Sequence, residues 1–348
     1  MKAQLKTKER ILGLLLGGAV GDAIGLPTVG MAAERIARRW PGELKHRFVF
    51  GRGMMSDDTE HASMTAQALI VAAGDEDKFR RSLAWKLRWW FIGLPAGVGL
   101  ATARACLRLW LGVSPERSGV YSAGNGPAMR SAIIGARFAN NEVKRRLFVA
   151  VSTRLTHTDP RAETAALAVA EVAAWILRGE TQEQFQAWLP ALSNDSEWSR
   201  TWKLIADGLS GEQSVRQFAE TLGLKLAVTG YAFHTVPVAL FAWLRHRGNY
   251  RDTIQSVICC GGDTDTTAAI AGSLAGCDVG RDEIPGEWLD NLKDWPRSKE
   301  WLSCVALRLA ESDSQKPVRL FWPGIIPRNL VFLATVLVHG LRRILPPY

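Results

Sequence analysis

Strand-like alternation of polar and apolar residues is hard to find anywhere along the chain. Two segments, 161–178 and 266–274, are rich in Ala and Leu and apolar on nearly every side, which is typical of helices buried among other helices. Ala is the best helix former and lets helix axes approach closely. The pattern therefore predicts an all-α protein, built as a compact multi-helix bundle.

Residues that begin and end helices agree with this prediction. Asp57 and Glu60 have the spacing of a capping box, and Gly179 follows an apolar helical segment. The apolar run 11–20 follows three lysines, as in a secretory signal, but it continues into GDAIG at 21–25 without an obvious cleavage site. We therefore expect a core helix there.

The chain divides only near its end. No Pro-, Gly- or Ser-rich linker and no charge block interrupts residues 8–298, which predicts one helical domain over that range. Beyond it, a polar stretch leads to an apolar helix, and we expect residues 299–348 to form a C-terminal helical appendage with no part in the chemistry. This tail would pack on the bundle or contact a partner or a membrane surface. Its apolar segment 330–341 is too short to span a membrane, so no transmembrane segment is predicted.

Composition is that of a globular protein, with 47% hydrophobic and 22% charged residues. The net charge of +9 suits an anionic ligand such as a diphosphate, and it would equally suit nucleic acid or an acidic membrane, although nothing else in the sequence indicates nucleic acid. The cysteines lack C-x-x-C spacing and are odd in number, which favours a reducing, cytoplasmic location; they are Cys106, Cys259, Cys260, Cys277 and Cys304.

The strongest chemical signal is the sequence GGDTDTT at 261–267, which lies between two apolar segments. Ionised carboxylates in an apolar setting are costly unless they are paired or bind a metal ion, and the nearest basic residues in sequence are remote. Two Asp and a Thr hydroxyl are hard oxygen ligands, which suit Mg²⁺, Mn²⁺ or Ca²⁺ better than zinc. The alternative is that Asp263 or Asp265 only caps the following helix.

A second acidic cluster, SDDTE at 56–60, also precedes a helical pattern. By itself it is typical of a helix cap, but adjacent carboxylates repel each other and a second Asp adds little to capping. Two Asp and a Ser hydroxyl are good metal ligands. The two clusters together provide enough oxygen ligands for two neighbouring divalent ions, which could orient a diol or activate a water molecule.

Two further segments place polar groups at turns. The glycine-rich sequence SAGNGPAMR at 122–130 opens a helix, and its backbone N–H groups could cradle a phosphate, although Gly-Asn-Gly is also ordinary loop chemistry. His157 lies at the start of a buried helical segment, where a lone His is more often structural than functional.

Five motifs follow one another in an order that resembles the ADP-ribosylglycohydrolase family over roughly residues 8–295: GDAIG (21–25), SDDT (56–59), GNGPAMR (124–130), TH (156–157) and GGDTDT (261–266). The resemblance implies an orthogonal helical bundle with two Mg²⁺ or Mn²⁺ ions in a central cleft. It also implies an enzyme that removes ADP-ribose from a modified acceptor, so the expected partner is an ADP-ribosylated protein or another ADP-ribose derivative.

Position by position, the resemblance implies a role for each motif. One metal ion would be held by Ser56, Asp57 and Asp58, and the other by Asp263 and Thr266, with Asp265 shared by both. The diphosphate and ribose would lie in a cradle formed by Ser122, Ala123, Gly124, Asn125, Gly126, Pro127 and Ala128. His157 would line the nucleotide cleft, and Asp58 is our candidate catalytic residue, orienting the attacking water.

One position departs from the family pattern. Several relatives carry a Glu shortly after the GDAIG-like motif, whereas residues 26–29 offer no acid here and the nearest one, Glu34, lies further along. A water molecule could fill the vacant coordination position.

We therefore predict a binuclear-metal hydrolase. ADP-ribosyl-arginine on protein is the favoured acceptor, because the loop at 122–130 and the GGDTDT run look closest to the arginine-directed members; ADP-ribosyl-serine, a nucleic-acid adduct and a free ADP-ribose derivative stay open. Two alternative functions also stay open. A two-metal phosphohydrolase usually needs metal-binding histidines, and this chain has no His-Asp dipeptide. A non-catalytic ADP-ribose-binding protein on the same fold would have no need of buried carboxylates.

Overall fold

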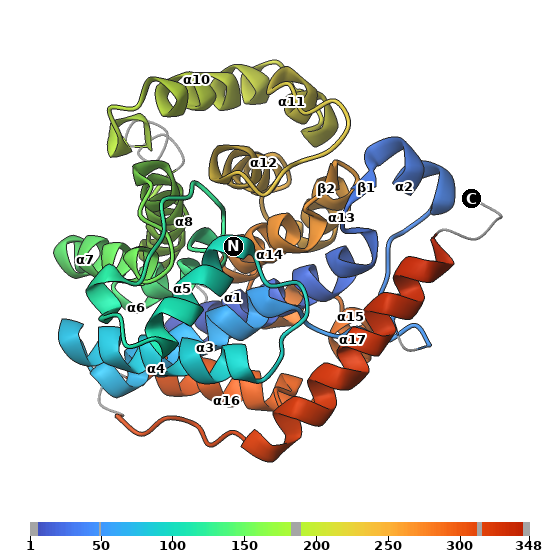
Figure 1. Cartoon of the computed structure of the whole chain (residues 1–348). Coiled ribbons are helices and arrows are strands. Elements are labelled where there is room, and N and C mark those ends of the chain that lie inside the picture. Colours follow the sequence, from blue (N-terminus) through green and yellow to red (C-terminus); the bar gives the residue numbers. More distant parts are fainter. Residues whose placement is uncertain (1–5, 49, 182–188, 312–314, 344–348) are drawn as a thin grey trace.

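A computed structural model describes residues 6–48, 50–181, 189–311 and 315–343, and this part of the chain is almost entirely helical (Figure 1). Within the described residues the strands are β1 (Met31–Ala32) and β2 (Gly261–Gly262), which pair antiparallel. The all-α prediction is confirmed. The α-helices are α1 (Thr7–Gly25), α2 (Ala33–Arg39), α3 (Asp57–Ala72), α4 (Glu76–Ile92), α5 (Leu100–Trp110), α6 (Ala132–Arg137), α7 (Glu142–Arg154), α8 (Pro160–Arg178), α10 (Ser196–Ser210), α11 (Val215–Thr221), α12 (Ala232–Arg245), α13 (Tyr250–Ile258), α14 (Thr264–Val279), α15 (Gly286–Asn291), α16 (Lys299–Ala310) and α17 (Ile325–Arg342). Short 3-10 turns are η1 (Leu26–Thr28), η2 (Pro115–Arg117), η3 (Ala128–Arg130), η4 (Leu189–Leu192), η5 (Arg281–Glu283) and η6 (Trp322–Gly324).

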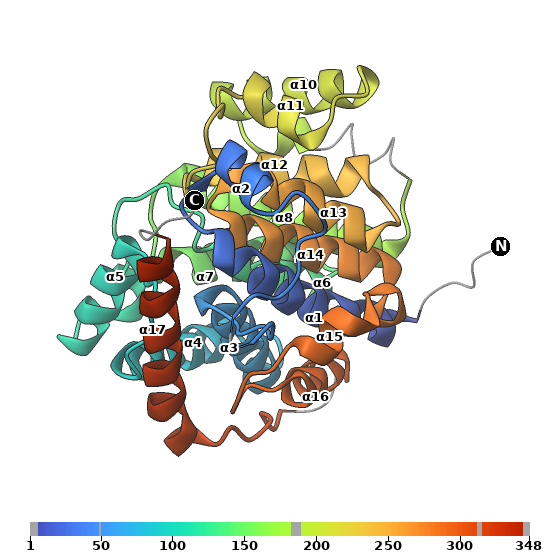
Figure 2. The same cartoon turned by 90° about the vertical axis from the view of Figure 1, so that its right-hand side faces the viewer.

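Helices α1 and α14 cross antiparallel at the centre of the bundle, and glycines on α1 determine how closely they approach (Figures 1 and 2). A Cβ atom added at any of four α1 glycines would collide with backbone oxygens of α14; these are Gly13, Gly17, Gly21 and Gly25. The four recur every fourth residue and therefore share one face of the helix. The close crossing brings the end of α1 against the start of α14, where Thr28 donates to the Thr264 hydroxyl at 2.8 Å.

Gly261 and Gly262 direct the chain into α14. Both have positive φ, 71° and 82°, and a Cβ atom on Gly262 would collide with the Val228 carbonyl. The Asp263 N–H donates to the same Val228 oxygen at 2.9 Å. Only glycine adopts this backbone without strain, so the GG pair fixes where the following Asp263 enters the helix.

The end of α8 matches the sequence prediction, whereas the start of α3 differs from it. Gly179 ends α8 in the left-handed conformation (φ 70°), as predicted. The capping box at Asp57 and Glu60 is wrong, because Ser56 is the N-cap residue of α3 and its hydroxyl accepts from the Asp58 N–H. Glu60 points inward instead, where its carboxylate accepts from Trp90 Nε1 and Arg297 Nη1, each at 2.5 Å.

The chain beyond residue 298 packs on the bundle. Leu302, Val305 and Leu309 of α16 belong to the main hydrophobic core, and α16 lies against α1 and α3. Helix α17 then runs along one side of the molecule and ends near α2 (Figures 1 and 2). Buried Arg328 of α17 pairs with Asp294. Helix α16 thus shares the core of the preceding helices, and the predicted division at residue 298 stays a prediction.

Among the described residues, two helices are long and apolar enough to cross a membrane by length and composition: Thr7–Thr28 and Trp322–Arg342. In the first helix, 94% of the apolar window is buried inside the protein. This is the core helix that the sequence predicted. The second is only 28% buried over its window, and it extends beyond the apolar segment 330–341, so the absence of a transmembrane segment stays a prediction. Because its Arg328, Asn329 and Phe332 are buried against the bundle, α17 is docked along one face and leaves the other exposed. The predicted contact of this tail with a partner or membrane surface stays a prediction.

Candidate functional site

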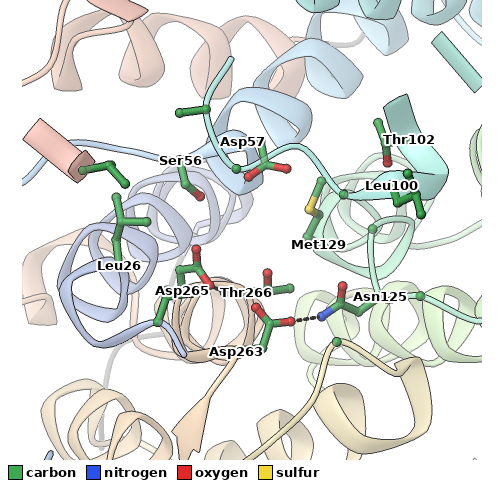
Figure 3. A pocket seen from close by; sticks show the side chains of 18 of the residues that line it. Leu26, Ser56, Asp57, Leu100, Thr102, Asn125, Met129, Asp263, Asp265 and Thr266 are labelled. Carbon is green, nitrogen blue, oxygen red and sulfur yellow. Dashed lines mark hydrogen bonds between the residues drawn. The ribbon is translucent and has the colours of Figure 1, made fainter. Parts of the chain in front are cut away.

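Ten of the predicted site residues line one cavity of 630 Å³, although they come from four separate stretches of sequence (Figure 3). The first acidic cluster lies at the start of α3 and the second at the start of α14. The glycine-rich loop and His157, three positions before α8, also line the cavity. They are Ser56, Asp57, Asp263, Asp265, Thr266, Ser122, Gly124, Asn125, Gly126 and His157.

Four other predicted residues do not line this cavity: Asp58, Ala123, Pro127 and Ala128. The carbonyl of Ala123 accepts from the Ala232 N–H at 2.8 Å, and the Ala128 N–H donates to the Asn125 carbonyl at 2.8 Å. These contacts shape the loop from behind.

Asp58 lies directly behind the cavity wall and is 2% exposed. Its Oδ2 accepts from the hydroxyls of Ser56 at 3.0 Å and Thr266 at 3.2 Å, so it connects the two acidic clusters. Its Oδ1 is buried and has no hydrogen-bond partner. A buried carboxylate oxygen without a donor is unfavourable, and a cation would satisfy it.

Asp22 is a functional residue that the site prediction missed. Its carboxylate, fully buried on α1, accepts from the N–H groups of Ser56 at 2.9 Å and Thr59 at 3.2 Å, at the start of α3. Burial raises its pKa to about 6, although these hydrogen bonds oppose the shift. The signal was present in the GDAIG motif, but sequence spacing could not show which N–H groups the carboxylate would meet. Asp22 therefore positions the first acidic cluster.

Burial and mutual repulsion both raise the pKa values of the acidic residues at this site. The pKa values of Asp57, Asp58 and Asp265 are raised well above the ordinary range, chiefly by burial and next by the charge of a neighbouring Asp in the same group. Among the described residues, no three Asp, Glu, His or Cys side chains converge as a ready-formed metal site. The donor set consists of carboxylate and hydroxyl oxygens, which is the chemistry of a Mg²⁺ or Mn²⁺ site.

Asp263 does not act as a helix cap. It occupies the N-cap position of α14, but its side chain makes no capping hydrogen bond. Its Oδ2 accepts instead from Asn125 Nδ2 at 2.6 Å (Figure 3). Asn125 also donates to the Thr235 hydroxyl at 2.9 Å, and its N–H donates to the Gly230 carbonyl at 3.0 Å. The glycine-rich loop is thereby attached to the second acidic cluster.

Arg130 and His157 both contact the glycine-rich loop at Gly126. Buried Arg130 donates to the Gly126 carbonyl at 3.3 Å and to the Thr156 hydroxyl at 2.7 Å. His157 Nδ1 lies 2.9 Å from that hydroxyl, and burial together with the Arg130 charge lowers the His157 pKa to about 3. A Cβ atom at Gly126 would come within 3.1 Å of the imidazole. A neutral imidazole is thus packed under the loop.

The loop is less open than the sequence suggested. The Gly124 N–H donates to the Ser122 hydroxyl at 3.3 Å, and the Asn125 N–H is engaged by Gly230, so two N–H groups of the expected phosphate cradle already have acceptors. The loop also leads first into the 3-10 turn η3 and only then into α6.

The rest of the cavity lining combines apolar residues with His339 and Arg343, and the C-terminal helix forms part of it. Leu26 and Val29 lie where the family pattern has an acid, whereas Glu34 is exposed and accepts from Arg216 at 2.6 Å, outside the cavity. Helix α17 contributes Phe332, Val336, His339, Gly340 and Arg343 to the lining. The C-terminal tail thus lines the cavity, and the prediction that it takes no part in the chemistry stays a prediction.

Comparison with known proteins agrees with this architecture. Residues 3–318 match the family ADP-ribosylglycohydrolase. An uncharacterized protein of Archaeoglobus fulgidus is 29% identical over 87% of this chain and 97% of its own length. The ADP-ribosyl-[dinitrogen reductase] glycohydrolase of Rhodospirillum rubrum is 26% identical over 82% of this chain and 90% of its own length. A solved structure described as an ADP-ribosylglycohydrolase-related protein complex superposes with a TM-score of 0.65 at 27% identity, covering 88% of this chain and 98% of the other.

The helical fold and these matches define the class of protein, which is a glycosidic-bond hydrolase. The chain belongs to the ADP-ribosylglycohydrolase family, and the resemblance noted in its motifs is confirmed. Helix α17, which closes one side of the cavity, lies beyond the matched residues.

Proposed function

We propose that the chain removes ADP-ribose from ADP-ribosyl-arginine on a protein, with the 630 Å³ cavity as its active site. The observation that carries the proposal is the convergence of two acidic clusters and a glycine-rich loop on that single cavity. A cavity of this volume is in the range that binds a ligand of nucleotide size. The family assignment favours this function over a phosphohydrolase or a non-catalytic binding protein.

Two Mg²⁺ or Mn²⁺ ions are part of the proposal. Ser56, Asp57 and Asp58 would hold one, Asp263 and Thr266 the other, with Asp265 between them. The unpaired Asp58 oxygen and the repulsion among the carboxylates support this, because both are relieved by divalent cations. When bound, such ions hold ribose hydroxyls and stabilise developing charge.

The chain's own residues would bind and orient the substrate. The Asn125 side chain and the neutral His157 imidazole line the side of the cavity where the loop would meet the diphosphate. Leu26, Val29 and Phe332 form an apolar wall that limits the access of water. Asp58 was the sequence candidate for orienting the attacking water, but it lies behind the wall. Asp57 lines the cavity and is the better placed carboxylate for that role.

The acceptor rests on more indirect support. The Rhodospirillum rubrum relative is named for an ADP-ribosylated protein, which favours a protein acceptor here. A guanidine leaves only when it is protonated, so the proposal requires a proton donor near the cavity that does not itself hold a metal ion. The five cysteines are free thiols, in keeping with a cytoplasmic location, which we also propose.

Two matched peptides test the acceptor, one carrying ADP-ribosyl-arginine and the other ADP-ribosyl-serine. We expect a higher kcat/KM for the arginine peptide. If the serine peptide were about tenfold faster, equivalent to about 1.4 kcal/mol of transition-state stabilisation, the arginine assignment would be abandoned.

A separate experiment tests the metal ions. Elemental analysis of the purified protein should find about two divalent ions per chain, and Asp265→Ala should lose metal and activity together. Full activity after thorough chelation would exclude the metal-dependent mechanism while leaving the family assignment intact.

A further inference from the structure

Helix α17 carries an exposed apolar face along most of its length. The helix lies on the outside of the molecule, and only 28% of its apolar window is buried (Figures 1 and 2). Its large apolar side chains that face outward are each 40–63% exposed: Ile326, Leu330, Val331, Leu333, Leu337, Val338 and Leu341. Five of the seven recur at intervals of three or four residues, so they form one stripe on the side opposite buried Phe332. A continuous apolar stripe of this length indicates a binding surface.

The inner face of α17 is fixed to the bundle. Buried Arg328 pairs with Asp294, and Asn329 Nδ2 donates to the Gly93 carbonyl at 2.6 Å. If α17 crossed a bilayer, these contacts would break and Arg328 would enter the hydrocarbon, which is costly for a charged side chain. The outer face can therefore bind a partner while the helix stays docked.

The charges at the two ends of α17 favour a negatively charged partner. Residues 315–343 contain no Asp or Glu. Their exposed cations are Lys316 and Arg319 before the helix and Arg342 in its last turn. The apolar stripe thus lies between positive charges, and an anionic surface would be attracted to both ends of the helix.

A second copy of the chain is a poorer match for this face. Around the middle of α17 the charges balance, because Lys299 pairs with Asp290 at 2.9 Å and Lys293 and Glu300 line one cavity with Val331. Two α17 helices packed against each other would bring cations against cations at their ends, whether they ran parallel or antiparallel. Like charges at such short range oppose association.

Aromatic side chains are exposed where the chain enters α17. They are Phe321, Trp322 and Trp295, and the ring centroids of Trp295 and Phe321 are 5.5 Å apart. Trp is favoured at the boundary between lipid headgroups and hydrocarbon, because its ring is apolar while its N–H stays hydrated. An apolar stripe, flanking cations and nearby Trp side chains are the features of a helix that lies at a bilayer surface.

We propose that the exposed face of α17 binds the surface of a membrane that contains anionic lipids, with the helix axis parallel to the bilayer. The apolar stripe enters the boundary between headgroups and acyl chains, and Lys316, Arg319 and Arg342 contact the lipid headgroups. Helix α17 lies beyond residues 3–318 that match the family, so this binding is a property added to the family domain. It does not depend on which acceptor the hydrolase uses.

Co-sedimentation with lipid vesicles tests the proposal on the full-length protein. Vesicles of phosphatidylcholine alone are compared with vesicles in which about a third of the lipid is phosphatidylserine. The test variant is Leu337→Gln with Leu341→Gln, because both side chains belong to the exposed stripe and neither lines the candidate active site. The matched control is Val143→Gln with Leu147→Gln, an exposed pair at the same spacing on α7.

We expect the wild-type protein to bind the phosphatidylserine vesicles at least about tenfold more tightly than the phosphatidylcholine vesicles. The test variant should weaken that binding about tenfold, and the control should change it less than about twofold. Lys316→Gln with Arg342→Gln should reduce both the preference for phosphatidylserine and the weakening of binding by added salt. Unchanged thermal unfolding and unchanged ADP-ribose binding would show that each variant is folded.

Four outcomes would overturn the proposal. Binding to neither kind of vesicle would assign the face to a protein partner, and an equal loss in the control variant would place the lipid contact elsewhere. Self-association in analytical ultracentrifugation that the Leu337 and Leu341 substitutions abolish would identify a second copy as the occupant. Retention on the vesicles after an alkaline carbonate wash would show that α17 crosses the bilayer instead of lying on it.

Discussion

Asn125 Nδ2 donates a hydrogen bond of 2.6 Å to Asp263 Oδ2, joining two residues that are 138 positions apart in sequence. The contact attaches the glycine-rich loop to the acidic start of α14, so the predicted substrate cradle and the predicted metal ligands form one unit. Because the Asp263 carboxylate accepts from Asn125, it faces the cavity and makes no capping hydrogen bond to α14.

Replacing Asn125 tests this unit. Asn125→Ala removes the donor to Asp263 and to Thr235, and we expect kcat/KM to fall at least about tenfold while the protein loses about 1–2 kcal/mol of stability. Steady-state kinetics and urea unfolding measure the two effects. The exposed Asn140→Ala is the control and should change neither. Equal effects of the two substitutions would remove Asn125 from the site.

The carboxylate cluster should respond to pH in the chelated protein. The folded-state pKa of Asp57 is raised above its unfolded value of 3.8 by burial and then by Asp265, so the folded state binds its proton more tightly. Stability contributed by the protonated group is present at low pH and is lost as pH rises through the folded pKa. In EDTA, we expect the Tm to fall with rising pH above about 4, and less so in Asp57→Asn.

The same substitution should behave in the opposite way when Mg²⁺ or Mn²⁺ is added. A cation that binds only the folded state raises the Tm of the wild-type protein, and Asp57→Asn should lose most of that increase because one ligand is missing. Differential scanning fluorimetry over a metal titration measures it. An unchanged metal response in the variant would show that Asp57 holds no ion.

The close crossing of α1 and α14 should be sensitive to a single methyl group. A Cβ atom at Gly25 would collide with the Thr264 carbonyl at the start of α14, so Gly25→Ala should cost about 1–3 kcal/mol and reduce activity by displacing Asp263 and Asp265. Gly42→Ala is the control, since no atom lies within 4 Å of its added Cβ, and it should change stability by less than about 0.5 kcal/mol. A harmless Gly25→Ala would contradict the packing argument.

Helix α17 should contribute to substrate binding through its buried face. Phe332 is 2% exposed and packs with Phe48 and Met54 beside the cavity, so Phe332→Ala should cost roughly 3 kcal/mol and raise KM for an ADP-ribosylated substrate. Leu337→Ala, on the exposed face of the same helix, should change neither the stability nor the KM appreciably. If only stability changed in Phe332→Ala, the helix would be a support without a role in binding.

Sequence alone determined the helical class, the family, and the residue types at the site, because these depend on composition, spacing and short motifs. It identified the acidic clusters at 56–60 and 261–267 and the loop at 122–130, since each is local in the chain. The sequence also shows the two glycines before Asp263 and the glycines of α1, but it does not show which backbone atoms they contact.

Tertiary structure decided where each side chain points and what it meets. Adjacent residues of a helix face different directions, so Asp57 enters the cavity while Asp58 connects the clusters behind it, and Glu60 turns toward Arg297 instead of capping α3. Asp22 became a positioning residue only through the crossing of helices that brings it to the start of α3. The position of α17 depends on contacts such as Arg35 with Arg343, 308 positions apart, and no local pattern encodes a pairing at that separation.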